Sequence, residues 1–205
     1  MTLSTGHSAS LDFAQPEPVD LTSGKYVKLW QGPQHPGLTG NMSLELTLDG
    51  DTILECKTHV GYLHRGFEKL MEQRTFIQNF TVVCRIAVPE PAFNEYLYAA
   101  AIEAISGVES PERAQWLRTL NLEMMRLASF LMWIGGQGGA FGQYTVANWT
   151  LTYRDYVLDL FEEMTGARIY HMYMVPGGVR AGLPAGFEKR IHEQMEKTDK
   201  LLDQI

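Results

Sequence analysis

The sequence predicts an α+β fold, in which an N-terminal antiparallel β-hairpin domain is followed by a helical bundle. Two runs of alternating apolar residues flank an Asp-Gly pair, and helical periodicity fills most of the chain after Gly61. The 205 residues are 45% hydrophobic and 20% charged, a composition typical of globular proteins and too apolar for intrinsic disorder. Since the net charge is −7, nucleic acid is not expected as a partner.

We expect three parts along the chain. Residues 1–23 are polar and lack apolar periodicity, which predicts a flexible leader. Residues 24–62 form the predicted β domain, whose hairpin turns at Asp49-Gly50 because both residues tolerate a positive φ. Its strands are expected over residues 26–30, 43–48 and 52–56. Residues 63–205 form the predicted helical bundle.

Helical periodicity and capping signals divide the bundle into five expected helices. They lie at about residues 65–80, 92–105, 111–134, 148–165 and 185–205. Gly107 and Gly166 have the position of C-caps, and Gly135-Gly136 predicts the end of the third helix. Residues 168–175 are expected to be extended. Because the last helix shows no stop signal, we expect the chain to be a fragment of a longer protein or one part of a split protein.

The connection at residues 32–40 is rich in proline and glycine and carries two polar side chains, Gln34 and His35. It is open to two interpretations. The prolines and glycines can serve only to shape the chain between two strands. Alternatively, a stiff loop tip inserts into a ligand cavity and presents Gln34 and His35 to the ligand.

Two arginines stand next to apolar residues. Arg65 begins an apolar helix, where it is either a salt-bridged surface residue or a buried cation beside a cofactor. Arg85 lies in the apolar run 82–88, and a guanidinium buried there without a partner is very unfavourable, so Arg85 must contact water, a carboxylate or a cofactor. His59 and His64 are five residues apart across a glycine, a spacing that fits no regular helical metal-binding pair.

The sequence also argues against several kinds of site. Cys56 and Cys84 form no CxxC pair, so we expect neither a structural zinc site nor an iron–sulfur cluster held by this chain alone. The glycines at 135–139 follow a predicted helix rather than a strand, which argues against a dinucleotide-binding loop. Residues 127–151 are nearly uncharged but are interrupted by glycines, so no membrane-spanning helix is expected there. No secretion signal is evident, and a cytosolic chain is expected.

A series of motifs runs through the chain in a fixed order: GPQHP, GYLHRGFEKL, RAQWLR, LEMMRL, TGAR and PGGVR. Together they resemble the D subunit of respiratory complex I, in the NADH:quinone oxidoreductase family. The resemblance covers about residues 32–184 and the first half of the family's usual length. It implies a fold related to the large subunit of [NiFe] hydrogenases. Ala87 and Glu90 occupy two of the nickel-ligand cysteine positions, so hydrogenase activity is not expected.

The resemblance implies a subunit of a membrane-associated complex that is not active alone. With the B subunit, such a chain forms the cavity where electrons pass from a 4Fe–4S cluster of the B subunit to quinone. The C subunit and a membrane H-type subunit are the further implied partners, at the cytoplasmic face of the cell membrane. The electron donor is left open between NADH, F420 and ferredoxin. The alternatives are a non-catalytic scaffold subunit and a hydrogenase-type complex that has lost its nickel site.

The resemblance also assigns residues to the side that faces the iron–sulfur cluster. Arg65 and Arg85 align with two arginines beside that cluster in the family. A cation there favours the reduced cluster, which also explains a guanidinium in an apolar run. Tyr170 occupies the position of a family histidine near the cluster, and His171 is its neighbour.

On the quinone side the sequence departs from the family. Thr39 replaces a histidine, Val88 replaces the tyrosine that binds the quinone headgroup, and Ala140 replaces an aspartate. The catalytic positions are expected at His35 and Thr39, and the quinone pocket is expected at Gly37, Leu38, Val88, Ala140 and Tyr144. Because these replacements occur together, we expect a remodelled site. Either His35, Thr39 and Tyr144 bind quinone instead, or the acceptor is different.

Overall fold

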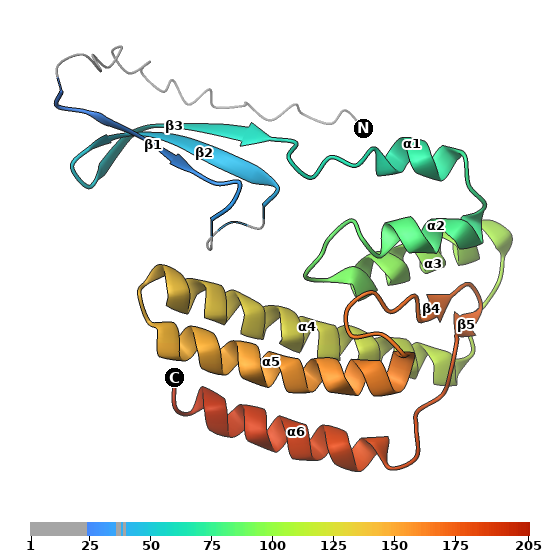
Figure 1. The fold of residues 1–205 in the computed structure, drawn as a ribbon. Coiled ribbons are helices and arrows are strands. Elements are labelled where there is room, and N and C mark those ends of the chain that lie inside the picture. Colours follow the sequence, from blue (N-terminus) through green and yellow to red (C-terminus); the bar gives the residue numbers. More distant parts are fainter. Residues whose placement is uncertain (1–23, 36–37, 39) are drawn as a thin grey trace, which may run out of the picture.

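The computed structural model describes residues 24–35, 38 and 40–205, and its fold is α+β as predicted. The predicted leader, residues 1–23, lies outside the described residues. The first described elements are three antiparallel strands, β1 (Val27–Gln31), β2 (Met42–Asp49) and β3 (Thr52–Val60), in the order β1-β2-β3. Figure 1 shows that this sheet stands beside the helices.

The central strand β2 provides the buried residues of the sheet. Ser43, Leu46 and Thr47 on β2 are buried, whereas most of β1 and β3 is exposed. The predicted hairpin at residues 49–50 is confirmed, and β3 continues four residues beyond its predicted end.

The rest of the described chain is mainly helical. The helices are α1 (Phe67–Glu72), α2 (Phe76–Val83), α3 (Pro91–Ser106), α4 (Glu112–Ala140), α5 (Tyr144–Thr165) and α6 (Phe187–Leu202). A short ribbon, β4 (Met174–Val175) and β5 (Gly178–Val179), lies between α5 and α6 in the sequence. The long helices α4 and α5 run side by side, with α6 along α5 (Figure 1). Their buried faces form the core, around Leu131, Phe161 and Phe187. None of the helices described is long and apolar enough to cross a membrane.

The prediction of one helix over residues 65–80 is wrong, because the chain breaks after α1 and begins again at α2. Thr75 forms a capping box at this break. Its Oγ1 accepts a hydrogen bond from the backbone N–H of Gln78 at 3.3 Å, and the Gln78 side chain accepts one from the backbone N–H of Thr75 at 3.1 Å. Apolar periodicity continues across such a break, whereas the capping box gives α2 its own start.

The predicted end of a helix at Gly135-Gly136 is also wrong, because α4 continues to Ala140. Two of its glycines are needed for the approach of α5. A Cβ atom at Gly135 would lie 2.7 Å from Thr150 Oγ1, and one at Gly138 would lie 3.1 Å from Val146 Cγ1. The glycines therefore mark close helix packing rather than a helix end, and α5 begins at Tyr144, earlier than predicted.

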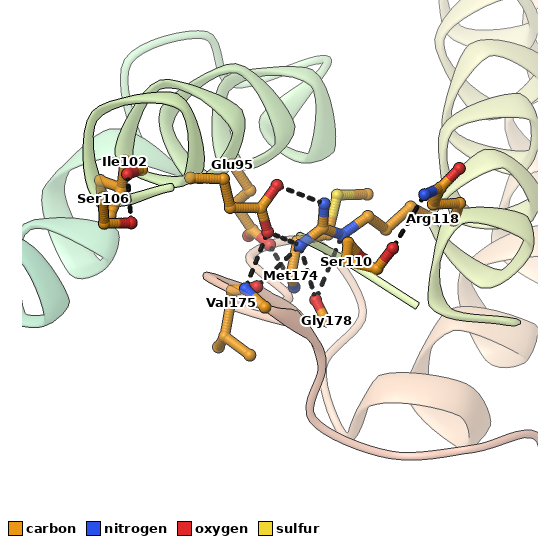
Figure 2. A network of polar contacts seen from close by, with 11 residues as sticks. Glu95, Ile102, Ser106, Ser110, Arg118, Met174, Val175 and Gly178 are labelled. Atoms are coloured by element: carbon orange, nitrogen blue, oxygen red, sulfur yellow. Dashed lines mark hydrogen bonds and ion pairs between the residues drawn. The ribbon is translucent and has the colours of Figure 1, made fainter. Parts of the chain in front are cut away.

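The predicted extended segment at residues 168–175 is largely irregular, and only Met174 and Val175 form a strand. Buried charged side chains from α3 and α4 hold this segment in place. Arg118 of α4 donates to the backbone oxygens of Val175 and Gly178, at 2.8 and 3.0 Å, and pairs with Glu103 of α3 at 2.6 Å. Figure 2 shows Arg118 directed to this ribbon, and Glu95 of α3 beside Met174, whose backbone N–H it binds.

Glu103 also binds the turn of the ribbon, since its Oε1 accepts a hydrogen bond from Gly177 N at 2.8 Å. The hydrogen bond from Arg118 lowers the pKa of the Glu103 carboxyl below its ordinary value. Glu103 and Arg118 are both largely buried, and backbone groups bind their remaining polar atoms, which is the arrangement a buried ion pair needs. The ion pair therefore fixes the ribbon against α3 and α4.

The glycines of α4 yield a matched pair of substitutions. Gly135→Ala is expected to destabilise the protein by about 1–3 kcal/mol, because the new methyl group overlaps Thr150 Oγ1 and forces α4 and α5 apart. Gly136→Ala is expected to stabilise it by up to about 1 kcal/mol, because no atom lies within 4 Å and alanine favours the helix. Denaturant unfolding of both variants measures the two effects. Equal effects of the same sign would contradict the close packing at Gly135.

Candidate functional site

A basic pocket lies where α1 and α2 meet the segment after α5, and its volume is about 310 Å³. We call it the arginine pocket. Its lining residues are Leu63, Arg65, Phe67, Leu70, Arg74, Thr81, Val82, Arg85, Ile86 and Met172. Three of them are arginines and none is acidic. The structure thus brings together Arg65, which precedes α1, and Arg85, which follows α2, and adds Arg74 from the break between the two helices.

Arg85 is held in place by the end of α2 and by the segment after α5. Its Nη1 donates to the backbone oxygen of Thr81 at 2.7 Å and lies 3.1 Å from Cys84 Sγ. Its guanidinium lies 4.7 Å from the centre of the Tyr170 ring, in cation–π geometry. Cys84 is fully buried, and burial raises the pKa of its thiol, so the sulfur is a neutral neighbour of Arg85.

The charge of the arginine pocket is not balanced within the described part of the chain. No Asp or Glu among the described residues forms a salt bridge with Arg65, Arg74 or Arg85. Several other arginines of the chain do pair, as Arg168 does with three carboxylates of α5. A pocket with this excess of positive charge attracts an anionic group from outside the chain.

Tyr170 and His171 point to different places. Tyr170 stacks on Arg85, whereas His171 is buried against Phe161, with ring centres 4.3 Å apart. Its Nδ1 lies 3.5 Å from Asn121 Nδ2. Burial lowers the pKa of His171 to about 4, so this ring is neutral at physiological pH and belongs to the core.

A second cavity, of about 580 Å³, lies at the C-terminal end of α4. We call it the apolar cavity. It is lined by Leu38, Pro89, Ser129, Met132, Trp133, Gly135, Gly136, Gln137, Gly139, Ala147 and Leu151. None of these described lining residues is ionisable. The lining residue Ser129 contacts a carboxylate, since its Oγ donates to Glu90 Oε1 at 2.9 Å.

Only some of the predicted quinone-side residues lie at the apolar cavity. Leu38 lines the apolar cavity, while Val88, Ala140 and Tyr144 are exposed and do not line it. Pro89 and Gly139, the immediate neighbours of Val88 and Ala140, do line it, so the predicted region is close to the cavity. Gly37 and Thr39 lie outside the described residues.

His35 is half-buried and lies in the connection between β1 and β2, near its start. Its Nδ1 lies 3.4 Å from Gln31 Nε2, and its backbone oxygen accepts a hydrogen bond from Leu38 N at 3.0 Å. His35 is therefore tied by its backbone to a residue that lines the apolar cavity. Its ring is not among the cavity's lining groups.

Two lining residues of the arginine pocket, Arg74 and Met172, are not indicated by the sequence pattern, and neither is the contact of Glu90 with Ser129 at the apolar cavity. Arg74 follows α1 at the break that periodicity does not reveal, and Met172 belongs to a segment without regular structure. Glu90 stands out in the sequence only as the occupant of a nickel-ligand position. Among the described residues, no three His, Cys, Asp or Glu side chains come together in a way that could hold a metal ion.

Comparison with known proteins gives a consistent picture. Residues 140–205 match the family described as "Respiratory-chain NADH dehydrogenase, 49 Kd subunit". The D subunit of the NADH-quinone oxidoreductase of Thermosipho melanesiensis is 49% identical over 176 residues, which cover 86% of this chain and 48% of that protein. The D subunit of the F(420)H(2) dehydrogenase of Methanosarcina mazei is 38% identical over 171 residues, which cover 83% of this chain and 46% of that protein.

A solved structure is similar over the same region. One chain of the membrane-bound sulfane sulfur reductase, an archaeal respiratory membrane complex, is 43% identical and superposes with a TM-score of 0.82. The match covers 91% of this chain and 49% of that chain. The chain therefore spans about half the length of the relatives it matches. By these matches, and by the motifs that first indicated it, the chain belongs to the family of the D subunit, or 49 kDa subunit, of respiratory complex I.

Proposed function

We propose that the chain is the D-type subunit of a membrane-associated, complex I-like oxidoreductase. In this proposal it forms, with a B-type subunit, the place where electrons leave a 4Fe–4S cluster. The observation that carries the proposal is the arginine pocket, where Arg65 and Arg85 line one cavity without an acidic partner in the described chain. The relatives named for NADH-quinone and F(420)H(2) oxidoreduction support the reaction class.

The cluster would belong to the partner, because this chain offers no ligand set for it. Cys84 is fully buried and Cys56 is exposed on β3, so the two sulfurs have unlike surroundings and belong to separate elements. An iron–sulfur cluster supplies one-electron transfer, and a neighbouring cation makes its reduced state more favourable. Arg65 and Arg85 would supply that positive charge, and the Tyr170 ring would hold the Arg85 guanidinium in place.

For the acceptor we propose quinone in the apolar cavity. Its size suits a small aromatic headgroup, and Ser129 and Gln137 are polar groups that can bind quinone oxygens. Protons would arrive through water, from His35 on the adjoining connection, or from Glu90 through Ser129. The catalytic role expected for Thr39 from the family resemblance remains part of this proposal. A C-type subunit and a membrane H-type subunit would complete the surroundings at the cytoplasmic face of the membrane.

A second candidate is a complex that reduces a sulfur compound instead of quinone. The observation that favours it is that no described lining residue of the apolar cavity is ionisable. Val88 and Ala140, which are next to the lining residues Pro89 and Gly139, replace the family's tyrosine and aspartate. The similarity to the sulfane sulfur reductase chain points the same way. Both candidates share the arginine pocket and differ only in the acceptor.

The electrostatic role of Arg85 is testable in the assembled complex. Arg85→Met is expected to lower the reduction potential of the adjacent cluster by on the order of tens of millivolts, since about 1.4 kcal/mol corresponds to roughly 60 mV for one electron. Arg85→Lys keeps the positive charge and is expected to lower the reduction potential less than Arg85→Met does. Arg126→Met removes an exposed arginine of α4 that does not line the pocket, and serves as the control. A spectroscopic redox titration measures the potentials. If Arg85→Met left the potential of a fully assembled complex unchanged, the cluster would not face this pocket.

The acceptor site is testable by filling the apolar cavity. Gly139 lines the cavity, and a Cβ atom there meets no other atom within 4 Å. Gly139→Leu should therefore narrow the cavity without disturbing the contact between α4 and α5. We expect the KM for quinone to rise severalfold, with no change in activity toward artificial acceptors that take electrons upstream.

The same preparations should be assayed with polysulfide. The quinone site is supported if the unaltered complex turns over quinone and Gly139→Leu raises the KM for quinone. Polysulfide reduction without quinone turnover would overturn the quinone assignment and support the second candidate.

A further inference from the structure

We infer that Glu95 is a positioning residue of the arginine pocket, because its buried carboxylate fixes the backbone that carries Tyr170 and Met172 against Arg85. The inference rests on the proposed function and deepens it. It concerns a residue of α3 that lines neither the arginine pocket nor the apolar cavity.

The carboxylate of Glu95 is fully buried and binds three successive backbone N–H groups. Oε1 accepts from Met172 N at 2.7 Å, and Oε2 accepts from Tyr173 N at 3.0 Å and from Met174 N at 3.5 Å. Figure 2 shows Glu95 reaching from α3 to the segment that contains Met174. Burial raises the pKa of this carboxyl, while the three N–H groups act in the opposite direction. A carboxylate bound in this way specifies one path for the backbone.

The backbone that Glu95 holds is in an unusual conformation. Met172 has a φ of +44°, in the left-handed region that side chains other than glycine rarely adopt. Such a conformation persists only where the surrounding structure fixes it. Glu95 binds the N–H of Met172, and Arg180 Nη1 donates to its backbone oxygen at 3.1 Å. The residue is therefore held from both sides.

This fixed backbone is what completes the arginine pocket. Among the described residues that line the pocket, Met172 is the one that comes from outside residues 63–86. Two residues earlier, Tyr170 places its ring 4.7 Å from the Arg85 guanidinium. If the segment were released, both side chains would leave the pocket and the Arg85 guanidinium would lose its cation–π partner. Glu95 thus acts on Arg85 through Tyr170 and Met172, without contact to any electron carrier.

The test is Glu95→Gln in the assembled complex. The variant keeps the size of the side chain but turns one acceptor into an NH2 group that opposes a backbone N–H. Hydrogen exchange of the peptide covering residues 170–174 is expected to accelerate about tenfold or more, because either the amide of Met172 or those of Tyr173 and Met174 lose their acceptor. The reduction potential of the adjacent cluster is expected to fall, in the same direction as in Arg85→Met. Loss of a carboxylate charge alone cannot lower that potential, so a fall reports displacement of Arg85.

Two further variants separate positioning from general destabilisation. Glu103→Gln alters the other buried carboxylate of α3, which binds the same segment at Gly177, and is expected to leave the potential unchanged. When Glu95→Gln is added to the Arg85→Met variant, the reduction potential of the cluster should fall no further.

Faster exchange without a potential change, in a complex where Arg85→Met does lower the potential, would overturn the inference. Unchanged exchange at residues 170–174 would overturn it as well. If Arg85→Met itself had no effect, the proposed function would fail, and the exchange measurement alone would decide whether Glu95 fixes the segment.

Discussion

The position of residues 172–178 depends on two carboxylates of one helix, α3, which hold this segment although it has almost no regular structure of its own. Glu95 binds the backbone at residues 172–174, and Glu103 binds it at Gly177. The two side chains are separated by about two helical turns, so they lie on the same face of α3. A segment of this kind cannot be fixed by a hydrogen-bonded ladder, and the polar side chains of neighbouring helices take over that role.

Neutral partners explain how the arginine pocket can exist in this chain. Burying an unpaired guanidinium is costly, so Arg85 remains at a pocket and uses the Thr81 carbonyl and the Tyr170 ring as neutral partners. The positive charge stays available to a group outside the chain because no described carboxylate forms a salt bridge with it. By contrast, Arg118 has its charge compensated by Glu103 and two backbone oxygens, and its role is structural.

Much of the fold could be predicted from the sequence, and the errors have physical reasons. The hairpin at residues 49–50 and helix α3 follow from local turn and capping preferences. The glycines at 135–139 predict a helix end only when read locally, because their contact with α5 is a tertiary feature that local propensity does not contain. At the pocket, motifs identify Arg65 and Arg85. They do not identify Arg74 and Glu95, because the roles of these two residues depend on segments brought together only by folding.

The central claim is that the arginine pocket faces an anionic redox centre of a partner subunit. A cryo-electron microscopy structure of the purified complex that contains this chain tests it most directly. The measurement is the distance from the Arg85 guanidinium to the nearest atom of an iron–sulfur cluster or its thiolate ligands. We expect this distance to be within about 6 Å, the range in which a positive charge strongly stabilises a neighbouring negative charge. An Arg85 that instead pairs with a partner carboxylate, with no cluster in that range, would contradict the claim.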